Sequence, residues 1–226
     1  TMEELELILH PMVDEAKEAT GSMGDDTPIA ILSDKYRPLS HFFRQKFSQV
    51  TNPPIDSIRE QSRMSLKTRF GNLRDVLDSN SYQESVFVMD SPVVTNSIFN
   101  KMLKFGKEEL VIIDCSFSTN ENALKENIRR IQGEAEEAVL SGKQHIVLTD
   151  KYTDETRVSI PMILATAAVH SFLTRKGIRS FISLHVQSAE CLETHYFAVL
   201  IGVGATTVNP YLAQECIRER HEKGLF

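Results

Sequence analysis

The sequence lacks three features that would assign it to a large functional class. It contains no run of about 18 apolar residues, the length that a membrane-spanning helix needs, so we expect no membrane span. It has no basic block, and its formal net charge of −6 disfavours binding to the phosphate backbone of nucleic acids. The first residues, "TMEE", lack the basic and apolar regions of a signal peptide, so we expect a cytoplasmic protein.

Cysteine is also scarce. The three cysteines, Cys115, Cys191 and Cys216, are an odd number without a repeating spacing. This pattern favours reduced thiols over a disulfide framework. The C-x-x-C and H-E-x-x-H motifs of common metal sites do not occur.

What remains is an ordinary globular composition, with 226 residues of which 41% are hydrophobic. From residue 85 onward, apolar strand patterns alternate with amphipathic helix patterns. The expected strands are 85–90, 109–115, 145–150, 179–187 and a short extended piece at 205–209. The expected helices are 95–105, 121–140, 159–177, 190–204 and 210–224, with Gly142 and Gly177 placed to end two of them.

This alternation predicts an α/β fold with a parallel sheet covered by helices. Four or five strand–helix units fit the length, fewer than the eight of a closed barrel. We therefore expect a partial (β/α) barrel or an open parallel sheet over residues 85–226.

The first 84 residues do not show this alternation of strands and helices. We expect them to form an N-terminal helical and irregular arm of the same structural unit. A helix is predicted over 3–19, and a second over 38–50, where aromatic and aliphatic residues recur at spacings of three and four. Residues 29–32 are expected to be a short apolar strand or a turn packed against the core. The stretch 51–84 is rich in turn residues, with a short strand predicted within 64–71.

Two acids stand where α/β sheets place active residues. Asp114 and Asp150 each stand at the C-terminal end of a predicted strand. Either acid would serve equally well as a helix N-cap, and the sequence does not present a complete set of nucleophile, base and oxyanion donors.

Other candidates have simpler structural explanations. His185, Cys191 and His195 would be metal ligands or ordinary core residues, and the core alternative is favoured. Thr1 would be an N-terminal nucleophile or the cut end of a longer chain. The run from Gly202 to Ala205 follows a helix rather than a strand, which favours a helix end over a dinucleotide-binding turn.

Five long blocks carry a family resemblance. They are "GSMGDDTPIAILSD", "FRQKFSQVTNPPIDSIRE", "MSLKTRFGN", "IPMILATAAVH" and "HYFAVLIGVGATTVNPYLAQE". From about His10 to the C-terminus, the sequence resembles the central domain of the glutamate synthase large subunit, in particular that of the bacterial NADPH-dependent form.

The resemblance implies a role inside a larger enzyme. In that family an amidotransferase domain releases ammonia from glutamine, and a tunnel carries it to an FMN-binding domain that makes glutamate from 2-oxoglutarate. An iron–sulfur cluster receives electrons from a small subunit that binds FAD and NADPH. The amidotransferase and FMN-binding domains and the small subunit are the partners implied. The central domain is an incomplete barrel, for which the resemblance implies neither a cofactor nor activity in isolation.

The stretch "QVTNPPIDSIRE" is the candidate functional segment. Two prolines stiffen the backbone, and the resemblance implies that the Thr-Asn pair before them lies at the narrow point of the ammonia tunnel. The expected tunnel or interdomain residues are Thr51, Asn52, Pro53 and Pro54. An interdomain strut without a tunnel role remains an equal alternative.

Charged residues near this segment have expected structural roles. Asp56, Arg59 and Glu60 are predicted to fix the arm through ion pairs or helix caps. Asp25 and Asp26 would hold a divalent cation or cap a turn, and the cap is favoured. The alternatives for the whole chain are an independent α/β lyase, using Asp114 and Asp150, or a small-ligand-binding module.

Overall fold

The computed structural model describes residues 2–18, 32–35, 37–44, 46–48, 54–75, 77–78, 86–119 and 123–226. The elements in chain order are α1 (Met2–Glu4), the π-helical η1 (Leu5–Leu9), α2 (His10–Asp14), the 3₁₀ turn η2 (Leu39–Phe42), α3 (Ser57–Arg63), β1 (Thr68–Phe70), β2 (Phe87–Met89), α4 (Asn96–Phe105), β3 (Leu110–Asp114), β4 (Ser116–Ser118), α5 (Ala123–Leu140), β5 (His145–Thr149), β6 (Arg157–Ser159), α6 (Met162–Arg175), η3 (Arg179–Phe181), β7 (Ser183–Gln187), α7 (Thr194–Gly202), β8 (Thr207–Asn209) and α8 (Tyr211–Glu222).

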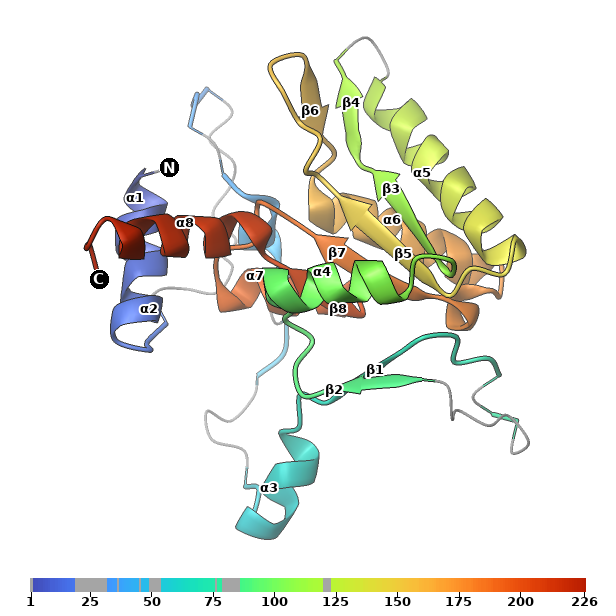
Figure 1. The fold of residues 1–226 in the computed structure, drawn as a ribbon, viewed down its shortest axis with the longest axis horizontal. Helices are drawn as coiled ribbons and strands as arrows, with labels where there is room; N and C mark the ends of the chain where they lie inside the picture. Colours follow the sequence, from blue (N-terminus) through green and yellow to red (C-terminus); the bar gives the residue numbers. More distant parts are fainter. Residues whose placement is uncertain are drawn as a thin grey trace.

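A four-stranded parallel sheet organises the fold (Figure 1). Its strands lie in the order β3-β5-β7-β8, so each strand–helix unit adds its strand beside the previous one. A parallel bridge between Val93 and Val208 continues the pairing beyond β8. Ascending order with parallel strands is the arrangement of a barrel wall that stops before closure. The predicted partial barrel or open parallel sheet is confirmed.

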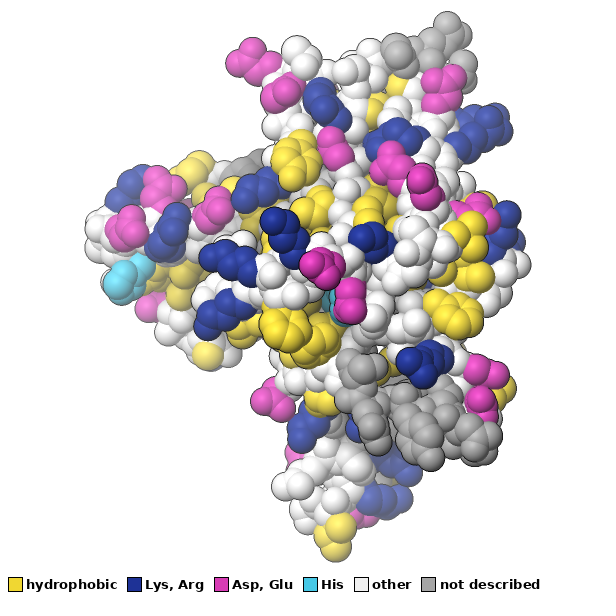
Figure 2. Space-filling view, turned by 45° about the vertical axis from the view of Figure 1, so that its right-hand side comes forward, with side chains coloured by type: hydrophobic (Ala, Val, Ile, Leu, Met, Phe, Trp, Pro, Cys, Tyr) yellow, Lys and Arg dark blue, Asp and Glu magenta, His cyan; other side chains and the backbone are white. Residues whose placement is uncertain are grey.

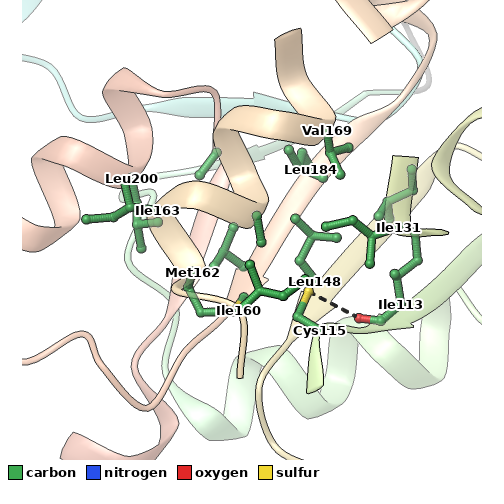
Figure 3. Packing of buried hydrophobic residues seen from close by; sticks show 14 of the residues in the cluster. Ile113, Cys115, Ile131, Leu148, Ile160, Met162, Ile163, Val169, Leu184 and Leu200 are labelled. Carbon is green, nitrogen blue, oxygen red and sulfur yellow. Dashed lines mark hydrogen bonds between the residues drawn. The ribbon is translucent and has the colours of Figure 1, made fainter. Parts of the chain in front are cut away.

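The main core lies between this sheet and its crossover helices. Alternate strand residues such as Ile113, Ile146, Leu148 and Leu184 have no exposed surface. They pack with residues of α5, α6 and α7, among them Ile131 (Figure 3). The amphipathic pattern of 121–140 accounts for the apolar face of α5, because every third or fourth residue of a helix lies on one face.

The opposite face of the sheet is mostly polar, although it is also covered. Side chains there include His145, Thr149, Ser183, His185 and Gln187, and all but Gln187 are buried. α4 covers part of this face, forming a small second core of Val94, Phe99 and Val147. Because strand side chains alternate between faces, one strand supplies both the apolar core and this polar layer.

The N-terminal elements contact distant parts of the chain. Figure 1 shows α1 and α2 beside α8, where Glu6 forms an ion pair with Arg220 at 2.9 Å and the His10 ring stacks on Phe226. The helix predicted over 3–19 therefore exists but ends at Asp14. α3, β1 and β2 extend below the sheet in Figure 1.

The predicted helix over 38–50 is wrong. Leu39–Phe42 forms only a 3₁₀ turn, and Phe43 is already extended. Leu39 packs against the core, whereas 38% of Phe43 and 72% of Phe47 are exposed. A short helix needs burial of its apolar face to be stable, and this segment has too little.

The predicted strand 85–90 has a different partner from the one expected. β2 pairs antiparallel with β1 rather than joining the parallel sheet. β4 and β6 form another antiparallel pair, which extends above β3 and β5 in Figure 1 and was not predicted. Most of the predicted strand or turn at 29–32 lies outside the described residues. Among the helices that are described, none has the length and apolar character to cross a bilayer.

Candidate functional site

A row of polar side chains runs along the carboxyl edge of the sheet. The last residues of β5, β7 and β8, namely Thr149, Gln187 and Asn209, lie side by side in the strand register. The Thr149 hydroxyl donates to Gln187 Oε1 at 2.9 Å, and Gln187 Nε2 donates to Asn209 Oδ1 at 3.1 Å. Asn209 Nδ2 donates in turn to Asn96 Oδ1 at 2.8 Å. This chain of bonds fixes the orientation of each amide.

A polar cavity of about 290 Å³ opens beside this row. The cavity lies between the strand ends, the start of α4 and the first two turns of α8. Three amide side chains of the hydrogen-bonded row line it, namely Asn96, Gln187 and Asn209. The lining also includes Asn100, Lys151, Tyr211, Glu215 and Arg218.

Asp150 follows β5 and is buried, with 2% of its surface exposed. Its Oδ2 accepts hydrogen bonds from the Ala189 backbone N–H at 2.8 Å and the Ser188 hydroxyl at 3.4 Å. Burial raises the pKa of Asp150 to about 6, and the negative charge of Glu190 adds to the rise against the opposing hydrogen bond from Ala189. The carboxylate thus ties the loop after β5 to the loop after β7.

Asp114, at the end of β3, forms an ion pair across the antiparallel β4–β6 pair. Its Oδ2 lies 2.7 Å from Arg157 Nη2, and its Oδ1 accepts the Ser116 backbone N–H at 2.8 Å. The same Arg157 nitrogen donates to the Ser116 carbonyl at 3.0 Å. The two acids proposed for a lyase therefore sit in separate structural contacts, which disfavours that alternative.

The metal-ligand candidates are not brought together. His185 is buried, with Nδ1 2.7 Å from the Thr207 hydroxyl and Nε2 3.1 Å from His145 Nδ1. Burial, with the charges of His145 and Arg179, lowers the pKa of His185 to about 3. His195 instead bonds the Ser40 carbonyl at 2.9 Å. In the described ranges, no three His, Cys, Asp or Glu side chains form a group able to hold a metal ion.

The cysteines do not provide a ligand set for an iron–sulfur cluster. Cys115 follows β3, Cys191 lies between β7 and α7, and Cys216 belongs to α8. Burial raises the pKa of the Cys115 thiol to about 12 and also raises that of Cys191, which favours the neutral thiol. These thiols do not fit the four converging thiolates that such a cluster needs.

The segment after the two prolines forms a capped, exposed helix. Asp56 is the N-cap of α3, and its Oδ1 accepts the backbone N–H groups of Ile58 and Arg59 at 3.1 and 2.9 Å. Arg59 Nε lies 2.5 Å from Asp56 Oδ2. These hydrogen bonds lower the pKa of Asp56, and the bond from the Arg59 backbone N–H has the largest effect. Pro54 precedes the cap and is exposed, and Glu60 lies in the first turn of the helix.

Several predicted site residues lie outside the described residues. These are Thr1, Asp25, Asp26, Thr51, Asn52 and Pro53. Their predicted roles stay predictions.

Gly204 explains the glycine-rich run before β8. It follows the end of α7 with φ of +116°, a backbone geometry that favours glycine. A Cβ at this position would lie 2.2 Å from the His170 ring. The run is a helix end with a close packing contact, as the structural alternative for this motif predicted.

Sequence reasoning missed the cavity at the strand ends. Lys151 follows β5, whereas Tyr211 and Arg218 belong to α8, so their proximity depends on the strand order. A signal was present, however, because Thr149, Gln187 and Asn209 each end an apolar strand with a polar side chain.

Comparison with known proteins extends over the whole chain. Residues 1–226 match the family described as "Glutamate synthase central domain". The chain is 58% identical to the glutamate synthase [NADPH] large chain of Azospirillum brasilense over 100% of its length, and 38% identical to that of Bacillus subtilis over 99%. It is 39% identical to the ferredoxin-dependent glutamate synthase of Pyropia yezoensis over 96%.

In each case the chain spans only a small part of the relative, 15% of the two large chains and 14% of the Pyropia protein. The resemblance found in the five sequence blocks and the incomplete barrel agree with this match. The chain belongs to the glutamate synthase central domain family.

Proposed function

We propose that this domain is a non-catalytic scaffold of a glutamate synthase large chain. It connects the amidotransferase and FMN-binding domains and forms part of the passage for ammonia between them. The observation that carries the proposal is the match to the central domain family over all 226 residues. The reaction is the formation of glutamate from glutamine and 2-oxoglutarate, and the neighbouring domains and a small FAD- and NADPH-binding subunit supply its cofactors.

The exposed arm supports a role between domains. α3 contains no buried residue, and Ile58 on this helix is 89% exposed. Met64 and Leu66, in the following turn, are 63% and 64% exposed. Apolar side chains grouped on one projecting element are typical of surfaces that another protein surface covers. We expect neighbouring domains to cover this arm in the full-length chain.

The anchoring of α3 supports a rigid wall at the residues before it. Asp56 fixes the first turn of the helix through two backbone N–H groups and Arg59. Pro54, two residues before that cap, has a φ fixed by its ring. A tunnel for a small neutral molecule needs a wall that holds its position, and Thr51 and Asn52 are the side chains proposed to form its narrow point.

The bonds made by the strand-end acids support the scaffold role. Asp114 is paired with Arg157, and Asp150 holds the loop after β7. Both side chains are therefore engaged in contacts within the fold, and the domain is proposed to be inactive in isolation.

The test is an Asn52→Leu substitution in the full-length large chain with its small subunit. Glutamine hydrolysis, which itself releases one glutamate, should continue while the conversion of 2-oxoglutarate to glutamate falls, because the bulkier apolar side chain obstructs the passage. The measurement is the ratio of glutamine hydrolysed to 2-oxoglutarate converted, under saturating 2-oxoglutarate. Asn72→Leu is the matched control, since it makes the same change in the same arm and should leave the ratio unchanged. A ratio that stays matched in Asn52→Leu would exclude the tunnel role.

A further inference from the structure

We propose that the cavity at the carboxyl ends of β7 and β8 binds a small oxyanion, a carboxylate or a phosphate ester. The cavity is separate from the arm that carries the proposed tunnel residues, so the inference does not depend on the tunnel. Its volume of about 290 Å³ suits a small metabolite rather than a nucleotide cofactor. The carboxyl edge of a parallel sheet is also where α/β proteins commonly bind their ligands.

The floor of the cavity is preorganised. Gln187 and Asn209 hold each other through the bond of 3.1 Å, and Asn209 is 1% exposed. The Asn96 backbone N–H donates to Gln214 Oε1 at 2.8 Å, and Asn96 Nδ2 donates to the Tyr211 carbonyl at 3.2 Å. These bonds join β7 and β8 to both α4 and α8. The floor therefore keeps its shape before a ligand arrives, which lowers the entropic cost of binding.

Two cations stand at the rim of this neutral floor. The Lys151 ammonium lies 5.7 Å from the centre of the Tyr211 ring, which holds a positive charge beside the cavity. Arg218 projects from the second turn of α8, with its Nε 3.9 Å from Glu222 and 72% of its side chain exposed. Figure 2 shows Lys and Arg side chains interspersed with Asp and Glu side chains over the left and centre of the face that it draws.

The lining of the cavity is less acidic than the chain as a whole. The chain carries a formal charge of −6, whereas the lining holds Lys151 and Arg218 against one acid, Glu215, and Glu222 pairs with Arg218 from outside the lining. Guanidinium and ammonium groups are the usual partners of carboxylate and phosphate oxygens. The carboxylate of Glu215 would repel a second negative charge on the ligand and is able to accept a hydrogen bond from a ligand hydroxyl. The lining thus fits a ligand with an oxyanion at one end and a hydroxyl donor at the other.

The test uses two probes with this design, glycerol 3-phosphate and glycerate. They share the hydroxyl groups and differ in the oxyanion, so their relative affinities distinguish a phosphate site from a carboxylate site. Binding to the full-length large chain is measured by titration calorimetry at fixed ionic strength. The variants are Lys151→Gln, Arg218→Gln and the double variant. Lys107→Gln, an exposed lysine in the turn before β3, is the control for loss of one positive charge.

We expect at least one probe to bind, and the double variant to bind it about tenfold or more weakly, because two charge-assisted contacts are lost. Lys107→Gln should bind as the unaltered protein does. Lys151 and Arg218 are exposed, so their replacement should leave the thermal midpoint unchanged. Equal affinity in the double variant and the unaltered protein would overturn the proposal, because the binding would then belong to another site. Absence of saturable binding of both probes to the unaltered protein would also overturn it.

Discussion

The β/α region from β3 to α8 and the arm around α3 are ordered by different means. In the β/α region, residues from four strands and three crossover helices share one buried core, in which Leu148 has no exposed surface. α3 buries no residue, and its order comes from its own cap and backbone hydrogen bonds. Figure 1 shows this contrast as a layered body and a projecting arm.

A few contacts join the two regions. The Gly71 backbone N–H donates to Ser183 Oγ at 2.8 Å, and that hydroxyl donates to the Gly71 carbonyl at 2.9 Å. The Phe70 ring meets His145 and His185 edge-on, with ring centres 5.9 and 5.4 Å apart. The sheet therefore positions the base of the arm at β1, while the surface of α3 remains exposed.

The comparison predicts that the same truncation has very different costs in the two regions. Leu148→Ala removes a fully buried side chain and should lower the free energy of unfolding by about 2–5 kcal/mol. Ile58→Ala truncates a side chain that is 89% exposed, so it should change the free energy of unfolding by less than about 0.5 kcal/mol. Urea denaturation of the 226-residue domain measures both. Similar costs would mean that the arm has a core of its own.

A second prediction concerns pH and the tie between the loops after β5 and β7. The pKa of Asp150 is raised to about 6 in the folded state, so its contribution to stability is full below its unfolded pKa and is lost as the pH rises through about 6. Asp150→Asn keeps an acceptor for the Ala189 N–H without the charge. It should therefore raise stability at pH 7 by about 2–3 kcal/mol, and the gain should vanish near pH 4.

The control for this prediction is Asp154→Asn. Hydrogen bonds from Thr156 lower the pKa of the exposed Asp154, so the same substitution there should not stabilise the domain at pH 7. Thermal unfolding of both variants from pH 4 to 8 measures the difference. A gain for Asp150→Asn that is independent of pH would contradict the assignment of the effect to a buried charge.

The smallest expected effect is local. Asp56→Ala removes the acceptor for two backbone N–H groups of α3, so amide exchange should accelerate within this helix. The amides of β5 should keep their exchange rates, because α3 contributes nothing to the core around that strand. Hydrogen exchange read by mass spectrometry tests this. Faster exchange in β5 as well would show that the arm and the sheet open together.

The sequence predicted the parts of the fold that depend on local patterns. Apolar strands, amphipathic helices and helix-ending glycines such as Gly142 and Gly177, both with positive φ, are encoded within short windows. The sequence-based prediction failed where contacts between residues far apart in the sequence determine the structure. The 38–50 segment shows helical periodicity but has little apolar surface on which to pack. β4 and β6 are three-residue strands that are far apart in the sequence, and the contact of Asp114 at the end of β3 with Arg157 braces their pairing.

The candidate site was likewise predicted only in the part that depends on local sequence. The position of Asp114 and Asp150 at strand ends was evident from the sequence, but their partners were not. Polar residues on the second face of the sheet were read only as parts of apolar strands, although His145 and Ser183 alternate with residues of the main core. Alternation over five residues is too short to distinguish a buried polar layer from a solvent-exposed face.

The antiparallel extension above β3 and β5 makes the two ends of the carboxyl edge unequal. β4 and β6 belong to different loops, yet their pairing and the Asp114–Arg157 contact brace the rim over the first two strands. No comparable pair stands over β7 and β8 in the described residues, where the cavity opens. Molecules that reach the strand ends should therefore approach from the β8 side. Lengthening the loop between β8 and α8 should hinder their entry more than an equal insertion at the tip of the β4–β6 pair.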